Sequence, residues 1–471
     1  MEKIKTRLQR INKPAKASLY YTMASIISKG ALLAFTPVFT RILSPDEYGI
    51  YSLYSSWMGI FTVIETLEIS GNLFYAGLGK DEDKDSYLLS SITLQCIMSS
   101  VFLILSFLFE DGISSLTKLS YNLLVSLTFQ IFLNSIISQK LSYMRYFYDY
   151  KRVFIINSLM GVLTPLISLF LILFSKLGGY SRIASPLIVS TVISLPIFLS
   201  LFKNGRGKVT RGRVLSVFVS AFPLFLHYIS LSVVAQGDKI IISHLFGRGD
   251  VARYSVAYSC GFMLSLVTTA LGGALSPWIR RKTASGDTSK ISEVTESLFF
   301  LFSSVTVMFF CFLPELFYFL AGEEFAESIF SVYPIAISVL ILFLINRNSS
   351  IMLFSGGRFK ISLQSSVSAA LSVILNYMFI KNFGYKAAGV STFLSYFVML
   401  LLGYLLLSKE IKRIFLREKN IFIMILVLIL CASLLYLLRG VFISRFLIFL
   451  AALLLLLPKI KSYESIIFDN G

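Results

Sequence analysis

Residues 153–175, VFIINSLMGVLTPLISLFLILFS, form an apolar block without a single charged side chain. A helix of about 20 such residues crosses the ~30 Å hydrocarbon core of a bilayer. Similar blocks recur along the 471 residues, of which 56% are apolar and 14% charged, too few to cover a water-soluble globule. The blocks are continuous and do not alternate with period two, so the sequence predicts an all-α, polytopic membrane protein and not a β-barrel.

The apolar blocks between polar breaks predict about fourteen transmembrane helices. They begin near residues 18, 48, 87, 119, 153, 183, 214, 251, 293, 329, 360, 387, 418 and 441. If the N-terminus is cytoplasmic, the cytoplasmic loops carry 31 of the 43 Lys and Arg residues and the opposite loops carry 11. Cytoplasmic loops are enriched in Lys and Arg, so we expect both termini in the cytoplasm. This asymmetry accounts for the charge of +18 without any binding of nucleic acid.

Two short motifs indicate an internal repeat. A shift of 203 residues places residues 47–52, EYGIYS, on residues 250–255, DVARYS, and a shift of 205 places Gly179-Tyr180 on Gly384-Tyr385. The offset spans six helices, an even number, so both halves insert the same way up and are related by a pseudo-two-fold axis along the membrane normal. We therefore expect an N-terminal lobe at 1–205, a C-terminal lobe at 206–412 and two appended helices at 413–471.

Four passages resemble a known family. They are FTPVFTRILSPDEYGIY at 35–51, GDKIII at 237–242, YSVAY at 254–258 and GYKAAGV at 384–390. Over roughly residues 15–460 the chain resembles the multidrug/oligosaccharidyl-lipid/polysaccharide exporter superfamily, and within it the Wzx-type flippases of O-antigen and capsule synthesis. The motifs do not identify the sugar.

The resemblance implies a transporter of the bacterial inner membrane. Its two lobes would surround a cavity that opens to each side in turn, and its substrate would be an undecaprenyl-pyrophosphate oligosaccharide whose tail stays in the membrane lipid. The substrate would move from the cytoplasmic to the periplasmic leaflet, coupled to a proton or a sodium ion. Other polysaccharide-assembly proteins would be partners, and no cofactor is implied.

Two cations of the first predicted span are candidate contacts for the pyrophosphate. Lys29 lies about halfway along it, where a cation costs roughly 2.5–3.5 kcal/mol and so requires an anion or a polar cavity. The alternative is a structural ion pair with a carboxylate of another helix. Arg41 ends the same span. Its guanidinium could bind phosphate through two hydrogen bonds, or could extend to the lipid head groups.

Two glutamates of the second predicted span are candidates for ion coupling. Glu65 and Glu68 are three residues apart, so on a continuous helix they share one face. Two buried carboxylates would repel each other and favour a shared proton or a bound cation. The alternative is a hydrated pair at the interface.

The seventh predicted span contains further charged groups. Asp238 and Lys239 are adjacent, about 100° apart around a helix, so each requires another partner. Asp238 could hold Lys239 or Arg253 in place, and both cations are candidate substrate contacts. Asp238 and His227 are candidates for ion coupling, because a histidine can bind a proton near neutral pH; a packing role is the alternative for His227.

Two prolines and four cysteines complete the candidate list. Pro37 and Pro223, in the first and seventh spans, each remove a backbone hydrogen bond and are expected to bend their helices. The cysteines stand far apart at positions 96, 260, 311 and 431, with no spacing typical of a metal site.

Two other functions compete with a flippase. A drug/cation antiporter of the same superfamily would have an acidic cavity. A membrane glycosyltransferase or polymerase is suggested by Asp81-Glu82-Asp83, which matches the metal-binding acidic pair of many nucleotide-sugar transferases. That tripeptide lies in a loop too short for a nucleotide-binding domain, so we expect a transporter and not an enzyme.

Overall fold

The computed structural model describes residues 13–175, 177–203, 207–284, 289–354, 357–406 and 419–468. These residues form helices joined by short turns and contain no strand. The chain forms two compact units, Met1–Gln236 and Gly237–Gly471, and each is described by itself below. The lobe boundaries expected at 205/206 and 412/413 fall outside the described residues, so that division stays a prediction.

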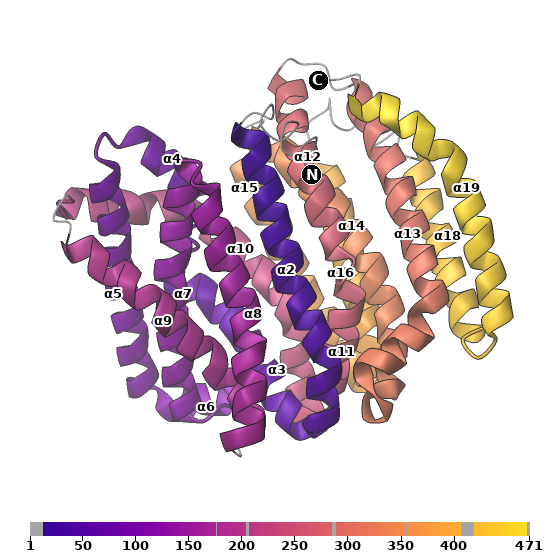
Figure 1. Ribbon diagram of the computed structural model, residues 1–471, viewed down its shortest axis with the longest axis horizontal. Helices are drawn as coiled ribbons and strands as arrows, with labels where there is room; N and C mark the ends of the chain where they lie inside the picture. The colour runs from indigo at the N-terminus through magenta and orange to yellow at the C-terminus, as the bar shows by residue number, and fades with distance from the viewer. Residues whose placement is uncertain are drawn as a thin grey trace, which may run out of the picture. The chain divides into compact units, whose positions relative to one another are not determined.

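The first unit is built from helices of residues 13–236 (Figure 1). They are α2 (Lys13–Ile42), α3 (Pro45–Thr66), α4 (Asn72–Lys80), α5 (Lys84–Leu108), α6 (Glu110–Thr117), α7 (Tyr121–Tyr146), α8 (Tyr150–Ser175), the 3₁₀ turn η1 (Gly178–Tyr180), α9 (Ser181–Lys203) and most of α10 (Arg211–Leu245). Helix α8 packs against α2 and α9, while α7 packs against α3, α5 and α9.

The second unit contains the end of α10 and the remaining helices. They are α11 (Arg248–Phe262), α12 (Ser265–Ala284), α13 (Ser289–Ala321), η2 (Glu323–Ser328), α14 (Ile329–Phe354), α15 (Arg358–Phe383), η3 (Tyr385–Ala387), α16 (Ala388–Leu406), α18 (Lys419–Leu437) and α19 (Phe442–Phe468). Helix α14 packs against α11, α12, α13, α16 and α18 and is the central helix of this unit.

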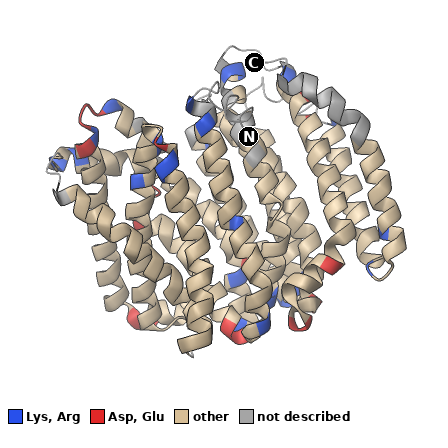
Figure 2. Cartoon of the chain, in the orientation of Figure 1, with Lys and Arg blue, Asp and Glu red and all other residues tan. Residues whose placement is uncertain are grey.

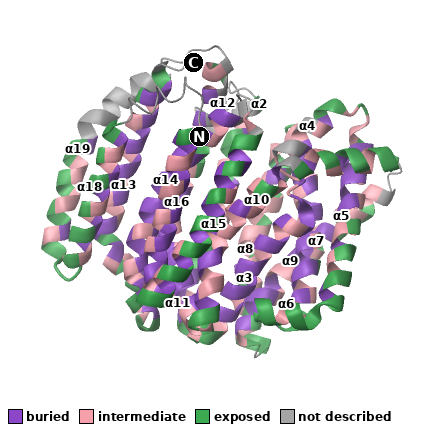
Figure 3. Cartoon of the chain, turned by 180° about the vertical axis from the view of Figure 1, so that it is seen from behind, coloured by how far each residue is buried: buried purple, intermediate pink, exposed green. Residues whose placement is uncertain are grey.

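The described helices have the polarity of membrane spans. Lys, Arg, Asp and Glu lie mostly near helix ends, with few at the middles (Figure 2). Exposed residues, in contrast, occur along whole helices (Figure 3). On α18 these include Ile423, Leu426 and Leu430, each more than half exposed. An apolar surface along whole helices is typical of a protein surrounded by lipid. Together with helices long and apolar enough to cross a membrane, it confirms the prediction of an all-α, multi-pass membrane protein.

The predicted number of fourteen spans is not confirmed. Among the described residues, ten helices are long and apolar enough to cross a membrane, or eleven if the bent α10 counts as one. The helix at the second predicted span, α3, has 22 residues but is not among the ten, and the eighth predicted span is interrupted between α11 and α12. In α19 the side chains are described for Phe442–Leu456, and this part is apolar.

The motifs of the internal repeat contact each other within each unit. Ser44 and Glu47 form a capping box that starts α3: Glu47 N donates to Ser44 Oγ, and Ser44 N donates to Glu47 Oε2. A Cβ atom on Gly179 would lie 2.0 Å from the backbone oxygen of Glu47, so only glycine fits there. In the second unit, Tyr385 packs in one cluster with Tyr254. Equivalent motifs thus meet in both units.

Glycine also allows close contact between α2 and α8. A Cβ on Gly161 would lie 2.5 Å from Cα of Ser28, whose Oγ donates to the backbone oxygen of Asn157 at 3.0 Å. Because Lys29 follows Ser28, this contact positions the candidate cation.

The contact gives a prediction about stability. Gly161→Ala is expected to lower the thermal unfolding midpoint of the purified protein, because overpacking a tight contact costs about 1–3 kcal/mol. Gly112→Ala in α6 is the matched control: nothing lies within 4 Å of its Cβ position, and alanine favours a helix by about 1 kcal/mol over glycine. Equal midpoints for the two variants would contradict the close contact.

Candidate functional site

Lys29 and Arg41 differ in their surroundings. Lys29 lies at the middle of α2 and is half-buried, whereas Arg41 is exposed near the end of the helix. Arg41 Nη1 donates to the backbone oxygen of Pro37 at 2.8 Å, the oxygen one turn earlier. Helix α2 continues through Pro37 to Ile42, so this proline does not break the helix. The roles of all three residues stay predictions.

Glu65 belongs to a fully buried network of six polar side chains between α3, α5 and α7. Every member is at most 6% exposed. We call it the α3–α5–α7 network, and its members, in order of hydrogen bonding, are Ser91, Gln139, Ser135, Gln95, Ser99 and Glu65.

All five hydrogen bonds of the α3–α5–α7 network run in the same direction. From Ser91 to Glu65 each side chain donates to the next, at 2.7, 3.0, 2.9, 3.0 and 2.5 Å. The amide nitrogens of Gln139 and Gln95 can only donate, so the amides fix this direction. The second hydrogen of Gln95 Nε2 is donated to the backbone oxygen of Glu65. Aligned hydrogen bonds polarise one another, so the network presents donors to Glu65.

The two carboxylate oxygens of Glu65 are therefore not equivalent. Oε1 accepts the Ser99 hydroxyl, whereas Oε2 is buried and has no hydrogen-bond partner in the described chain. Oε2 is therefore the oxygen that can bind a proton while every hydrogen bond of the network is kept unchanged. The site thus suits a carboxyl group that changes its protonation state while its position is held.

The expected pairing of Glu65 with Glu68 on one helical face is wrong. Helix α3 ends at Thr66, and Leu67 and Glu68 both have left-handed backbone conformations, with φ of 50° and 51°. These non-glycine residues turn the chain between α3 and α4, so the i, i+3 rule does not apply. Glu68 is half-buried, whereas Glu65 is 0% exposed. The two carboxylates have separate environments.

Asp238 lies at the centre of a second buried cluster, in the second unit. It accepts hydrogen bonds from the Tyr254 hydroxyl at 2.6 Å and from Thr392 Oγ1 at 3.1 Å, both at Oδ2. Its Oδ1 accepts the backbone N–H of Lys239 at 2.7 Å. Asp238 is 0% exposed, and its partners belong to α11 and α16. We call these residues, with Lys239, the Asp238 cluster.

The Lys239 ammonium contacts an aromatic ring of α11. Its Nζ lies 4.1 Å from the centroid of the Tyr258 ring, a distance at which a cation is attracted to the ring face. Lys239 also interacts electrostatically with Asp238. The seventh predicted span therefore brings Asp238, which is buried, and Lys239, which is half-buried, together at one site.

Arg253 does not join the Asp238 cluster, so the prediction that Asp238 holds Arg253 is wrong. Arg253 Nη1 lies 2.7 Å from Asp250 Oδ1, and its Nε donates to the backbone oxygen of Glu324 at 3.2 Å. The pair is i, i+3 on α11 and half-exposed. Its geometry suits a structural ion pair at a helix start.

His227 and Pro223 lie in α10. The His227 ring is half-buried, with its centroid 5.4 Å from that of Tyr228. The parts of α10 before and after residue 223, Arg211–Phe222 and Leu224–Leu245, are inclined by 51°. The side chain of Pro223 lies outside the described residues, so its role in bending stays a prediction, as does ion coupling by His227.

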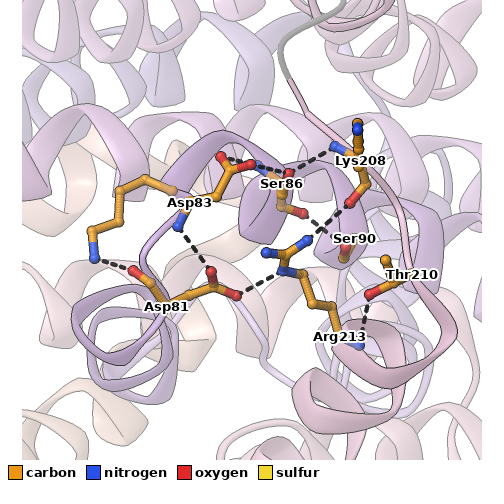
Figure 4. Close-up of polar contacts among 8 residues, drawn as sticks. Asp81, Asp83, Ser86, Ser90, Lys208, Thr210 and Arg213 are labelled. Carbon is orange, nitrogen blue, oxygen red and sulfur yellow. Dashed lines mark hydrogen bonds and ion pairs between the residues drawn. The ribbon is translucent and has the colours of Figure 1, made fainter.

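Asp81 and Asp83 hold a loop in place. Arg213 Nε lies 3.0 Å from Asp81 Oδ2, while Asp83 starts α5 by accepting from Ser86 N and Ser86 Oγ (Figure 4). The hydrogen bonds from Ser86 lower the pKa of Asp83 below its usual value. Lys208 N donates to Ser86 Oγ at 2.7 Å, which ties the segment before α10 to this loop. The carboxylates are thus engaged with the protein, and the described residues offer no cluster for a metal ion.

Helices α14, α16 and α18 line an open apolar pocket of about 360 Å³. Tyr333, Phe393 and Tyr436 are among its lining residues, and no predicted site residue is. Of the predicted site residues, Glu65 belongs to the α3–α5–α7 network, and Asp238 and Lys239 belong to the Asp238 cluster. The other predicted site residues belong to neither.

A family model described as polysaccharide biosynthesis protein matches residues 15–283, more than half of the chain. The chain belongs to this family. A relative from the Lsg locus of Haemophilus influenzae is 23% identical over 278 residues. The match covers 56% of this chain and 65% of the relative, so the chain spans less than two thirds of that protein's length.

Solved transporters share the fold of this member of the polysaccharide biosynthesis family. The lipid II flippase MurJ, in an inward closed conformation, is similar with a TM-score of 0.65 at 15% identity, over 91% of this chain and 99% of MurJ. An inward-facing multidrug resistance MATE transporter of the MOP superfamily has a TM-score of 0.65 at 14% identity, over 84% and 96% of the two chains. A MOP superfamily transporter from Pyrococcus furiosus has a TM-score of 0.58 at 15% identity, over 86% and 97%.

The family match and the shared fold agree with the predicted resemblance, because the family is one of polysaccharide biosynthesis and the fold is shared with solved transporters of the MOP superfamily. The solved proteins with this fold that are named above are transporters and a flippase. At these identities the similarity to solved structures shows the fold and not the substrate.

Three buried arginines are not among the predicted site residues of this family member: Arg182, Arg347 and Arg445, each at most 5% exposed. From the sequence, Arg347 is expected to be a cytoplasmic anchor of its span. Arg445 of α19 pairs with both oxygens of Glu315 in α13, at 2.6 and 2.8 Å. Arg347 of α14 donates to Asn348 and to the Tyr404 hydroxyl. Glu315 and Arg445 carry opposite charges within apolar blocks, and this pattern in the sequence could have predicted that they pair.

Proposed function

We propose that the protein is a flippase that moves an undecaprenyl-pyrophosphate oligosaccharide from the cytoplasmic to the periplasmic leaflet of the bacterial inner membrane. The observation that carries this proposal is membership of the polysaccharide biosynthesis family over residues 15–283. The fold shared with the lipid II flippase MurJ supports it. Alternating access, with both termini cytoplasmic, is part of the proposal.

The charges within the apolar helices support a large anionic substrate. Lys29 provides a half-buried cation at the middle of α2, where the pyrophosphate could offset the cost of burying it. Lys239 provides a second cation, in the Asp238 cluster. Arg41 is exposed at the end of α2 and could contact the phosphates on entry or release.

We further propose that transport is coupled to a proton or a sodium ion. Two buried carboxylates of the described chain support coupling: Glu65 in the first unit and Asp238 in the second, both 0% exposed. A carboxylate in a low-dielectric site changes its charge when it binds a cation, and its interaction with the surrounding helices changes with it.

A glycan export assay in cells tests the flippase. In a strain that lacks the protein, we expect lipid-linked oligosaccharide to accumulate and surface polysaccharide to disappear, and the wild-type gene to restore both. Normal surface polysaccharide in the deletion strain, with no other flippase in the cell, would contradict the proposal.

A drug/cation antiporter is the second candidate function. The buried carboxylates Glu65 and Asp238 favour it, because a cationic drug could be drawn to an acidic site, and a multidrug resistance MATE transporter has the same fold. Resistance to cationic dyes separates the two functions. An antiporter confers resistance on a sensitive strain, whereas the proposed flippase leaves dye tolerance unchanged.

A further inference from the structure

Arg182 is a buried cation in the first unit to which neither the family nor the sequence analysis gives a role. It is the second residue of α9, directly after the turn η1, and is 5% exposed. Its helix begins at the same end of the unit at which α2 ends and α3 begins, because Gly179 of η1 contacts the backbone of Glu47.

Three aromatic rings surround the Arg182 guanidinium. Its Cζ lies 3.9 Å from the ring centroid of Tyr51, 4.4 Å from that of Tyr48 and 4.6 Å from that of Phe39. We call these residues the Arg182 cage. Ring faces attract a cation, by about 2 kcal/mol or more when water is excluded. They do not satisfy N–H groups that point outward in the guanidinium plane.

One nitrogen of the Arg182 guanidinium has no hydrogen-bond acceptor. Its Nη1 is buried without a partner in the described chain, and a charged donor that is buried and unpaired is more unfavourable than a neutral one. The hydroxyls of Ser181 and Ser185, on the first two turns of α9, are also buried without a partner. The neighbouring acid Glu47 accepts from Ser44 N and Ser44 Oγ at Oε2, and it forms no ion pair with Arg182 within the part of the chain that the structure describes.

We propose that Arg182 binds the phosphate group of a lipid, with two N–H groups of the fork on two phosphate oxygens. A guanidinium matches phosphate in this bidentate geometry better than an ammonium does. The N-terminus of α9 adds a favourable field for an anion. The site lies where apolar helices begin and end, which is the depth of lipid phosphates.

Two kinds of lipid carry this group: a phospholipid, and the undecaprenyl pyrophosphate of the substrate. The second source rests on the proposed function, whereas the first does not. The test below measures lipid binding and not transport. If the flippase proposal is wrong, undecaprenyl pyrophosphate is no longer a candidate ligand, but binding of a phospholipid at Arg182 can still be tested.

The test uses the delipidated full-length protein in a neutral detergent, and the readout is the thermal unfolding midpoint at rising lipid concentration. The probes are phosphatidylglycerol, undecaprenyl pyrophosphate and diacylglycerol, which has no phosphate. We expect at least one phosphate lipid to raise the midpoint and diacylglycerol to leave it unchanged. The phosphate lipid that raises the midpoint at the lower concentration is the one that the site prefers.

Arg182→Gln is expected to lower the affinity for the phosphate lipid about tenfold or more, because a charge-assisted hydrogen bond is worth about 1.5–3 kcal/mol. Arg152→Gln is the matched control, since its side chain is 73% exposed, and its affinity should equal that of wild type. If Arg182→Gln does not fold, Arg182→Lys replaces it: this variant keeps the charge within the cage but loses the fork. Equal affinity of wild type and the folded Arg182 variant, or no effect of either phosphate lipid, would overturn the proposal.

Discussion

Lys29→Ala is expected to abolish export of the lipid-linked glycan while the amount of protein in the membrane stays normal. The substrate pyrophosphate has to pass through a low-dielectric region, and the half-buried Lys29 places a cation there. Loss of a charge-assisted contact costs about 1.5–3 kcal/mol, or roughly tenfold or more in binding. Lys29→Arg should retain part of the export, because the charge remains and the geometry changes.

A structural ion pair predicts a different outcome for the same variant. Removing one member of a buried pair leaves its partner uncompensated, which lowers the amount of folded protein. Membrane abundance measured beside glycan export separates the two roles. Normal abundance together with normal export would contradict both and leave Lys29 without a function.

Glu65→Gln is expected to lower the transport rate about tenfold or more, while the amount of protein in the membrane stays normal. The reason is that, in the proposed cycle, a cation has to bind the Glu65 carboxylate and neutralise it. Glutamine keeps an oxygen that accepts from Ser99 and places an N–H₂ group where the unpartnered Oε2 now lies. The α3–α5–α7 network should therefore persist, and the side chain should be fixed in a neutral form. Transport and its dependence on the ion gradient are measured in inverted vesicles.

Glu68→Gln is the matched control, because it makes the same chemical change three residues later, outside the α3–α5–α7 network. We expect a smaller effect, since Glu68 is only half-buried and lies in the turn between α3 and α4. Normal, gradient-dependent transport by the double Glu65→Gln, Glu68→Gln variant would assign both carboxylates a structural role.

The architecture was predictable because apolar block length is a local property. The block at 153–175 became α8, Tyr150–Ser175, and the Ser44–Glu47 sequence became the capping box of α3. The break at Leu67 and Glu68 was not predictable. Both residues adopt left-handed conformations without being glycine, and tertiary packing, not local preference, selects such conformations.

The candidate site was predictable only in part. Burial of Asp238 followed from a charged residue in an apolar block, but its acceptance of a hydrogen bond from Thr392, 154 residues later, depends on the packing of α10 and α16. The α3–α5–α7 network also depends on tertiary packing. The donor-to-acceptor direction of its hydrogen bonds depends on how the amides of Gln95 and Gln139 are oriented. Serine and glutamine are too common in helices to indicate such a network from sequence.

Flipping in reconstituted vesicles tests the central claim most directly. The purified protein is inserted into liposomes that contain undecaprenyl-pyrophosphate oligosaccharide in both leaflets, and an impermeant glycan-cleaving enzyme is added outside. A flippase makes the inner-leaflet substrate accessible, so we predict nearly complete cleavage with the wild-type protein and cleavage of only the outer half with Lys29→Ala. Cleavage of only the outer half with wild-type protein, under proton and sodium gradients of either direction, would contradict the account.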